Sequence, residues 1–158
     1  MKKLLLICMS FVVGLHFSFC SSTEVKTVDP NEAIVNELNK QLEALEIEGF
    51  ESNKTVLADK IYREWEKKGI PALKEILPKV PAGYTLKVTG HADPYGGLEA
   101  ANKIAEGRAK HIQERVIKAL GVDSSKIGIK SYGAAEYEQE KNQSISKNRR
   151  VEFQIYKN

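Results

Sequence analysis

Asp93 and Arg108 are the two side chains whose types, spacing and surroundings are best suited to binding a charged ligand. Asp93 lies in a loop rich in glycine and proline, residues 90–97, directly after a segment in which apolar and polar residues alternate. In α/β folds, polar ligands commonly bind to loops that follow a strand and precede a helix. Asp93 is therefore a candidate ligand-binding carboxylate.

Arg108 falls on the apolar face of an expected helix, residues 99–120. At 100° per residue, the apolar arc contains Ala101, Ile104, Ala105, Ala109, Ile112, Val116, Ala119 and Leu120. A guanidinium group in this arc needs an anion or a cleft, because burying an unpaired charge is costly. An arginine at the helix rim can also extend its head into solvent, and Arg115 lies near the edge of the same arc. Position alone therefore leaves both interpretations open.

Together, Asp93 and Arg108 would suit a ligand that carries one ammonium and one carboxylate group. The aspartate would accept from the ammonium, and the guanidinium would bind the carboxylate with two parallel hydrogen bonds. Each charged contact contributes roughly 1.5 to 3 kcal/mol.

Alternating and helical segments predict the elements that position this pair. Strands are expected at residues 50–57 (with an exit loop), 84–90, 127–132 and 151–156. Helices are expected at residues 59–68 and 71–77, separated at Gly69, and at residues 99–120 with Gly121 as C-cap. The order strand, helix, strand, helix, strand, strand predicts an α/β (α+β) sandwich with helices packed on one face of a mixed sheet.

The first nineteen residues have the features of an export signal. Lys2 and Lys3 precede a run without charges, residues 4–15, and that run is too short for a membrane-spanning helix, which needs about 20 residues. We therefore expect residues 1–19 to be a signal peptide that is removed.

Cys20 follows the apolar run and would be the only cysteine of the mature chain, which excludes an intrachain disulfide. The segment Phe17-Ser18-Phe19-Cys20 resembles a bacterial lipobox, although such motifs prefer leucine and a small residue where this chain has Phe17 and Phe19. Some spirochaetal lipoproteins have similar departures. We expect acylation, including palmitate, at Cys20, with a secreted form carrying a free thiol as the alternative, and residues 20–29 as a tether.

A helix is expected at residues 30–48, because Asp29, Pro30 and Glu32 form a helix-start signal. Its apolar stripe contains Ile34, Val35, Leu38, Leu42 and Leu45. The stripe could pack on the domain or on a second copy of the chain.

Charge and histidine content argue against two classes of function. Loss of Lys2 and Lys3 leaves 22 basic against 21 acidic side chains, so no nucleic-acid partner is expected. An enzyme would have to use His91, Asp93 and His111, whose spacing matches no known metal or acid–base motif. We expect no cofactor, no metal and no catalytic activity.

Several motifs, in order, resemble the OmpA-like peptidoglycan-binding domain that is shared by OmpA, Pal and MotB. They are Val88-Thr89-Gly90-His91-Ala92-Asp93, Gly107-Arg108-Ala109, Gly133 and Asn148-Arg149-Arg150-Val151-Glu152. The resemblance spans residues 50–156 and implies a domain at 49–158. It also implies that Asp93 and Arg108 hold the diaminopimelate of a peptidoglycan stem peptide, with Ala92, Asn148 and Arg149 bordering the pocket. Ala92 and Ala101 stand where the family has threonine and asparagine, so fewer neutral hydrogen bonds to the ligand are expected.

The resemblance implies a noncatalytic lipoprotein that links an envelope membrane to the cell wall. An outer-membrane anchor with the domain in the periplasm is the expected arrangement, with exposure on the cell surface as the other option. The alternative function is a protein-interaction lipoprotein, an adhesin or Pal-like partner, with Tyr62, Trp65 and the 34–45 stripe as contact face. Tyr62 and Trp65 are interpreted here as core residues.

Overall fold

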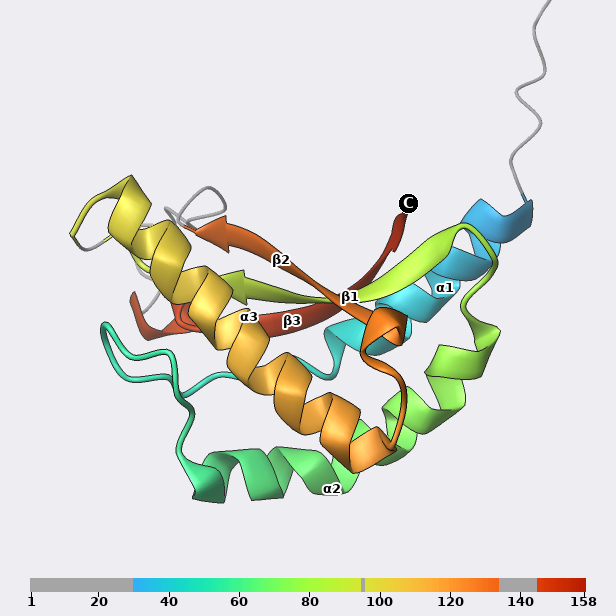
Figure 1. Cartoon of the computed structure of the whole chain (residues 1–158), viewed down its shortest axis with the longest axis horizontal. Coiled ribbons are helices and arrows are strands. Elements are labelled where there is room, and N and C mark those ends of the chain that lie inside the picture. Colours follow the sequence, from blue (N-terminus) through green and yellow to red (C-terminus); the bar gives the residue numbers. More distant parts are fainter. Residues whose placement is uncertain (1–29, 95, 134–144) are drawn as a thin grey trace, which may run out of the picture.

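A mixed three-stranded sheet forms the centre of the domain in the computed structural model, which describes residues 30–94, 96–133 and 145–158 (Figure 1). The central strand β1, Tyr84–His91, runs parallel to β2, Ile127–Gly133, and antiparallel to β3, Val151–Lys157. Helices pack on one face of this sheet, which confirms the predicted fold class. The expected signal peptide, Cys20 and the tether lie outside the described residues.

The two-residue period of each strand sets which side chains enter the core. Leu86 of β1 lies between Ile127 of β2 and Ile155 of β3, and Val88 lies beside Phe153. All five side chains are buried, at 3% exposure or less. The polar residues between them therefore point to the opposite face of the sheet.

Helix α3, Leu98–Leu120, crosses β1 and β2 and ends at Gly121, whose φ of 67° is the left-handed conformation that favours glycine. The approach of α3 to β1 depends on Gly90. A Cβ atom at Gly90 would collide with the backbone carbonyl of Ala105. This close approach brings the middle of α3 against the end of β1, where the candidate site lies.

Helix α2, Asp59–Ile76, is continuous through Gly69 and Pro71, so the predicted break between two helices is wrong. A proline inside a helix costs about 3 kcal/mol, because it removes one hydrogen bond and crowds the preceding turn. Burial of the apolar residues around it, Ile70, Leu73 and Ile76, offsets this cost. Gly69 also has a packing role, because a Cβ there would collide with the Trp65 ring.

Trp65 and Tyr62 are core residues, as predicted. Tyr62 is 2% exposed, and the Trp65 ring stacks on Phe153 with 5.3 Å between centroids. The Trp65 indole N–H donates to the Leu45 carbonyl at 2.8 Å. These aromatic side chains join α2 to the segment that follows α1, so they do not form an exposed contact face.

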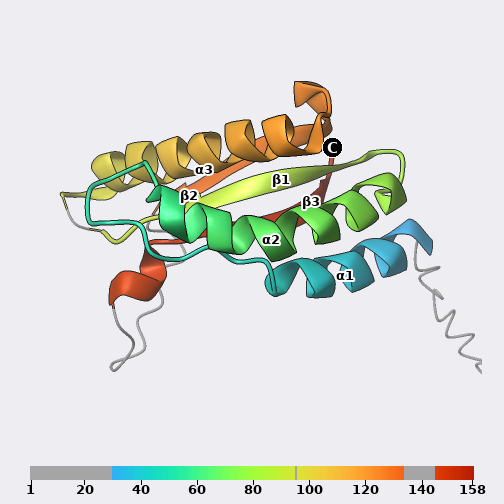
Figure 2. The same cartoon turned by 90° about the horizontal axis from the view of Figure 1, so that it is seen from below.

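Helix α1, Pro30–Glu43, lies beside α2 and packs along β3 (Figure 2). Its apolar stripe faces the domain, with Val35, Leu38 and Leu42 buried. The Asn39 side chain donates to the Ile155 carbonyl and accepts from the Ile155 N–H at 2.7 Å, as a neighbouring strand would. The stripe is therefore occupied within the chain, and the helix is shorter than the predicted residues 30–48.

The first strand of the predicted order, residues 50–57, is wrong; before it, Ile47 forms an isolated bridge with Val151. Residues 50–57, where a strand was expected, form turns and irregular backbone instead. Their carbonyl groups bond to arginine side chains rather than to a strand, as described below. Among the described residues, no helix is both long and apolar enough to cross a membrane.

Candidate functional site

Asp93 lies two residues beyond the end of β1, where the Ala92 N–H still donates to the Gly133 carbonyl at 2.9 Å. The Asp93 side chain is 7% exposed, and its Oδ2 accepts from Arg149 Nη1 at 3.3 Å. Arg149 Nε donates in turn to the Phe50 carbonyl at 2.9 Å. No other hydrogen bond to the Asp93 carboxylate is present within the described part of the chain. One of its two oxygens is therefore uncommitted.

Arg108 is fully buried at the centre of the site. Its guanidinium group donates to three backbone carbonyls: Nε to Lys54 at 2.9 Å, Nη1 to His91 at 2.8 Å and Nη2 to Glu51 at 3.1 Å. The group also lies over the Phe50 ring, 5.2 Å from its centroid. Arg108 thus connects α3 to the end of β1 and to the irregular segment 51–54.

Burial lowers the pKa of Arg108 to about 10. The negative charge of Asp93 opposes this effect, and the positive charge of Arg149 adds to it. Carbonyl groups satisfy the donors of a guanidinium but carry no formal charge, so Asp93 is the anion that compensates Arg108. Two guanidinium groups face one carboxylate, which leaves an excess of one positive charge at the site.

The structure brings the predicted residues Asp93, Arg108 and Arg149 together. The direct ion pair joins Asp93 to Arg149, whereas Arg108 acts on Asp93 through its charge. The carbonyl groups of Phe50, Glu51 and Lys54 were not foreseen as partners. A backbone carbonyl gives no signal in the residue types, so this part of the site was inaccessible to sequence reasoning.

Ala92 and Ala101, which replace polar residues of the family motif, lie in one small apolar cluster. Both are buried together with Ala105, and Ile104 packs against the group. The two departures therefore lie together, because both alanines belong to the same cluster. As a result, two neutral hydrogen-bonding groups of the family motif are missing from this cluster.

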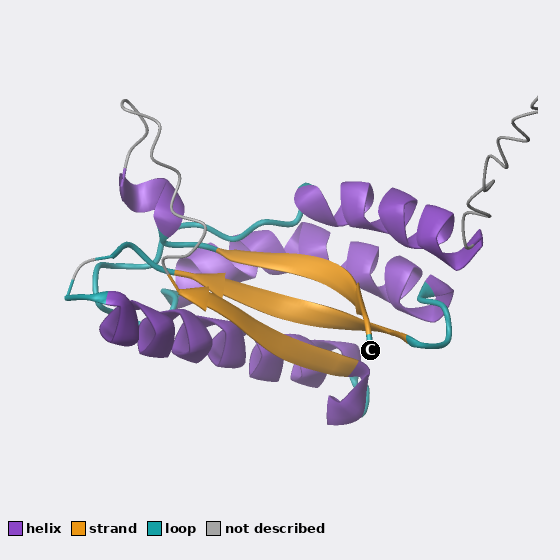
Figure 3. Ribbon diagram, turned by 90° about the horizontal axis from the view of Figure 1, so that it is seen from above, coloured by secondary structure: helices purple, strands orange, loops and turns teal. Residues whose placement is uncertain are grey.

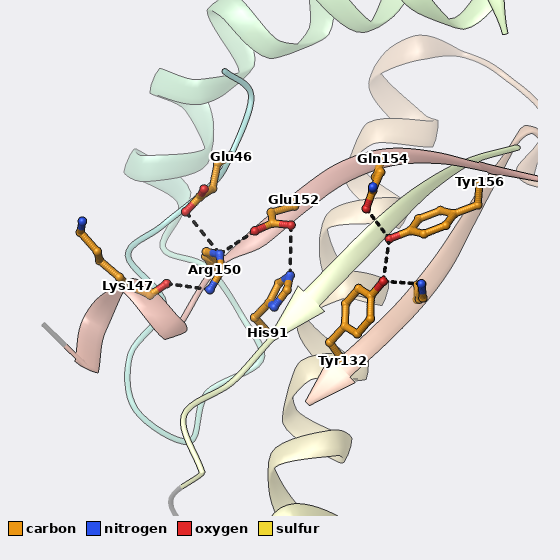
Figure 4. A network of polar contacts seen from close by, with 9 residues as sticks. Glu46, His91, Tyr132, Lys147, Arg150, Glu152, Gln154 and Tyr156 are labelled. Atoms are coloured by element: carbon orange, nitrogen blue, oxygen red, sulfur yellow. Dashed lines mark hydrogen bonds and ion pairs between the residues drawn. The ribbon is translucent and has the colours of Figure 1, made fainter. Parts of the chain in front are cut away.

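The other two residues of the Asn148-Arg149-Arg150 run have surroundings different from those of Arg149. Asn148, at the end of the 3-10 helix Ile145–Asn148, is buried at 4% exposure. Arg150 Nε donates to Glu152 Oε1 at 2.7 Å, and Glu152 Oε2 lies 3.3 Å from His91 Nε2 (Figure 4). Arg150 also contacts the Glu46 carboxylate at 3.6 Å. The Asn-Arg-Arg run thus divides, with Arg149 facing Asp93 and Arg150 facing Glu152.

The charges around Arg150 shift two carboxyl groups in opposite directions. Burial alone would raise the pKa of Glu152, but His91 and Arg150 outweigh it and lower that pKa to about 2. Burial raises the pKa of Glu46, and the nearby charge of Arg150 only partly opposes this. Glu152 is therefore the stable anion of the cluster.

The two histidines considered for catalysis, His91 and His111, have different neighbours. His91 faces Glu152 and stacks on Tyr132, whereas His111 of α3 lies near Asp59 and Arg115, and burial lowers its pKa. Across residues 30–94, 96–133 and 145–158, no three acidic, histidine or cysteine side chains form a group suited to a metal ion.

The model of the OmpA family matches residues 50–152, which are about two thirds of the chain and include every residue of the site. The chain belongs to the OmpA family. A comparison with curated proteins finds no match.

Solved structures of OmpA-like domains have the same fold. The C-terminal domain of Helicobacter pylori MotB is 18% identical with a TM-score of 0.54, covering 72% of this chain and 84% of that one. The peptidoglycan-associated lipoprotein of Burkholderia pseudomallei is 19% identical with a TM-score of 0.59, covering 78% of this chain and 99% of that one. The OmpA-like domain of Francisella tularensis FopA1 is 25% identical with a TM-score of 0.51, covering 70% and 69%.

We predict that Glu152→Gln removes part of the acid sensitivity of this OmpA-like domain. The folded-state pKa of about 2 lies below the ordinary 4.5, so Glu152 contributes stability above pH 4.5 that is lost as the pH falls toward 2. At pH 7 the free energy of unfolding of the variant should be lower than that of wild type, on the order of 2 kcal/mol. This difference should become smaller by pH 2.5. Urea unfolding at both pH values measures the difference, and a difference that is the same at pH 7 and pH 2.5 contradicts the prediction.

Proposed function

We propose that the domain binds the stem peptide of peptidoglycan without catalysis, through the zwitterionic end of a diamino acid of the diaminopimelate type. The observation that carries the proposal is the Asp93 carboxylate, with one oxygen uncommitted, beside the two guanidinium groups of Arg108 and Arg149. Such a cluster can accept a cation at the carboxylate and an anion at the excess positive charge.

The contact between Arg149 and Asp93 is weak enough to yield to a ligand. It consists of one hydrogen bond of 3.3 Å, whereas charge-assisted hydrogen bonds are usually 2.7–2.9 Å and arginine–carboxylate pairs are often bidentate. A ligand ammonium would bind the uncommitted oxygen of Asp93, and the Arg149 side chain would remain available to the ligand carboxylate.

Arg149 is the more accessible of the two guanidinium groups, with 22% of its side chain exposed, while Arg108 is fully buried. We therefore assign the direct carboxylate contact to Arg149. Arg108 contributes its charge from within the protein, and three of its five N–H groups hold the carbonyls of Glu51, Lys54 and His91. In the OmpA-like motif, the arginine at this position contacts the ligand. Here, Arg108 could contact the ligand only through the two N–H groups that do not bond to carbonyls.

The family supports peptidoglycan as the partner. OmpA-like domains bind peptidoglycan in MotB and Pal, and one structural neighbour is named as a peptidoglycan-associated lipoprotein. Another neighbour is a periplasmic domain of MotB, which supports the cell envelope as the location of this chain. Ala92 and Ala101 leave the charged contacts intact and remove neutral ones, so single-site affinity should be modest.

A lipid anchor at Cys20 would make modest affinity sufficient. The tether between Cys20 and the start of α1 at Pro30 spans at most about 35 Å when fully extended. With acyl chains in a membrane and the domain held within this reach, binding to the wall becomes effectively intramolecular. The protein would then link an envelope membrane, by expectation the outer one, to the cell wall.

Asp93→Asn should reduce binding to isolated peptidoglycan sacculi at least 10-fold. The substitution keeps the shape of the side chain and removes the charge that attracts the ligand ammonium, a contact contributing roughly 1.5 to 3 kcal/mol. Co-sedimentation with sacculi and titration with a soluble stem-peptide fragment measure the loss.

Glu99→Gln is the matched control, because it also removes one carboxylate but from an exposed pair with Lys103 on α3. Urea unfolding of both variants verifies that they are folded. Wild-type affinity of Asp93→Asn for sacculi, or an equal loss in the Glu99→Gln control, would show that the proposed site is wrong.

Mass spectrometry of the mature protein tests the anchor. We expect an N-terminus at Cys20 that carries acyl chains, and we expect Cys20→Ser to move the protein from the membrane fraction to the soluble fraction. A mature protein that retains residues 1–19, or an unmodified Cys20 thiol, excludes the lipoprotein assignment.

A further inference from the structure

The face of the sheet opposite the helices carries side chains that the proposed peptidoglycan site does not use. In Figure 3 the three strands lie in front of the helices, and no α-helix of the described residues crosses this face. Four partly exposed side chains form what we call the lysine–tyrosine patch: Lys87 of β1, Lys130 and Tyr132 of β2, and Tyr156 of β3.

The two tyrosines of the patch meet above the central strand. They belong to the outer strands β2 and β3, yet their hydroxyl oxygens lie 3.3 Å apart (Figure 4). Lys130 Nζ donates to the Tyr132 hydroxyl at 2.5 Å, and the Tyr156 hydroxyl donates to Gln154 Oε1 at 2.5 Å. These contacts hold the rings and the Lys130 ammonium group in fixed positions.

Two ammonium groups are gathered at one aromatic ring. Lys130 Nζ lies 3.9 Å and Lys87 Nζ lies 5.6 Å from the centroid of Tyr156. Gly128 provides space for this arrangement, because a Cβ there would lie 3.3 Å from Lys87 Cγ. Neither lysine forms an ion pair with a carboxylate of the described residues. The lysine–tyrosine patch therefore holds two like charges together, and neither is paired with a described carboxylate.

A buried hydroxyl group lies beneath the patch. Thr89 is paired with Lys130 on one side and with Glu152 on the other, and it is fully buried. Its Oγ1 has no hydrogen-bond partner among the described residues. A buried polar group without a partner is unfavourable, and Thr89 is such a group next to Lys130.

We propose that the lysine–tyrosine patch docks an acidic segment of a partner protein. A glutamate or aspartate side chain placed between Lys87 and Lys130 would relieve the repulsion of their charges and accept hydrogen bonds from their ammonium groups. This surface is separate from the Asp93 site and does not depend on peptidoglycan binding.

The charge distribution around the patch favours a polypeptide over a membrane. Beyond Gln154, at the outer edge of β3, the carboxylates of Glu43, Glu46 and Glu152 line a cavity of about 200 Å³. A flat anionic membrane on this face would meet both the lysines and these carboxylates. A polypeptide can place acidic residues over the lysines and basic or neutral ones near the carboxylates.

The test measures binding of a fluorescein-labelled peptide of alternating glutamate and serine to the full-length protein by fluorescence anisotropy. We expect weak binding that declines as salt increases, and at least a 10-fold loss in the Lys87→Gln/Lys130→Gln double variant. The control is Lys110→Gln/Lys118→Gln, which removes the same charge from exposed positions of α3, on the other face of the sheet. It should bind the peptide as wild type does.

Parallel measurements separate the alternatives. Chemical shifts of the Tyr132 and Tyr156 ring protons should change on addition of the peptide, and Asp93→Asn should bind it normally. Absence of peptide binding, an equal loss in the control variant, or binding to phosphatidylglycerol vesicles in preference to the peptide would each overturn the proposal.

Discussion

The burial of one guanidinium group organises this domain. Arg108 projects from α3 into the protein and donates to carbonyls of Glu51, Lys54 and His91, so one side chain joins a helix, an irregular segment and the end of the central strand. A buried cation is unfavourable unless its donors are bonded and an anion lies nearby. The carbonyls meet the first requirement, and Asp93 meets the second. The position of Asp93 and the path of residues 51–54 both follow from satisfying Arg108.

The other features of the site can be understood as consequences of this arrangement. Gly90 permits α3 to approach β1 closely enough for the Arg108 side chain to reach the His91 carbonyl. Ala92, Ala101 and Ala105 fill the adjoining space without polar groups. Arg149 then supplies a second positive charge, held by the Phe50 carbonyl, at the more exposed side of Asp93. Arg108 is thus the buried arginine that holds backbone carbonyls, and Arg149 is the partly exposed arginine that pairs with Asp93.

Much of the fold and part of the site were predictable from the sequence, because they depend on local patterns of residues. Alternation in residues 84–90 and 151–156 predicted two strands correctly. The motifs placed Asp93 and Arg108 in one charged cluster, although the direct contact of Asp93 is with Arg149. The errors arose where tertiary packing overrides local preference. Gly69 and Pro71 predict a helix break, but burial of Ile70, Leu73 and Ile76 keeps α2 continuous. The segment 50–57 is no strand because its carbonyls bond to Arg108 and Arg149, and Asn39 and Ile47 cover the edge of β3. Contacts between side chains and distant carbonyls leave no periodic signal.

The most direct test of this account is the free energy of unfolding of Arg108→Lys. Lysine keeps the positive charge but cannot donate to three carbonyls in a planar fork. If Arg108 shapes the site by holding residues 51–54 and the end of β1, the variant should be less stable than wild type by about 3 kcal/mol in urea unfolding. A variant that is as stable as wild type but has lost peptidoglycan binding would contradict the account. Arg108 would then be a ligand contact and not the residue that holds residues 51–54 and the end of β1.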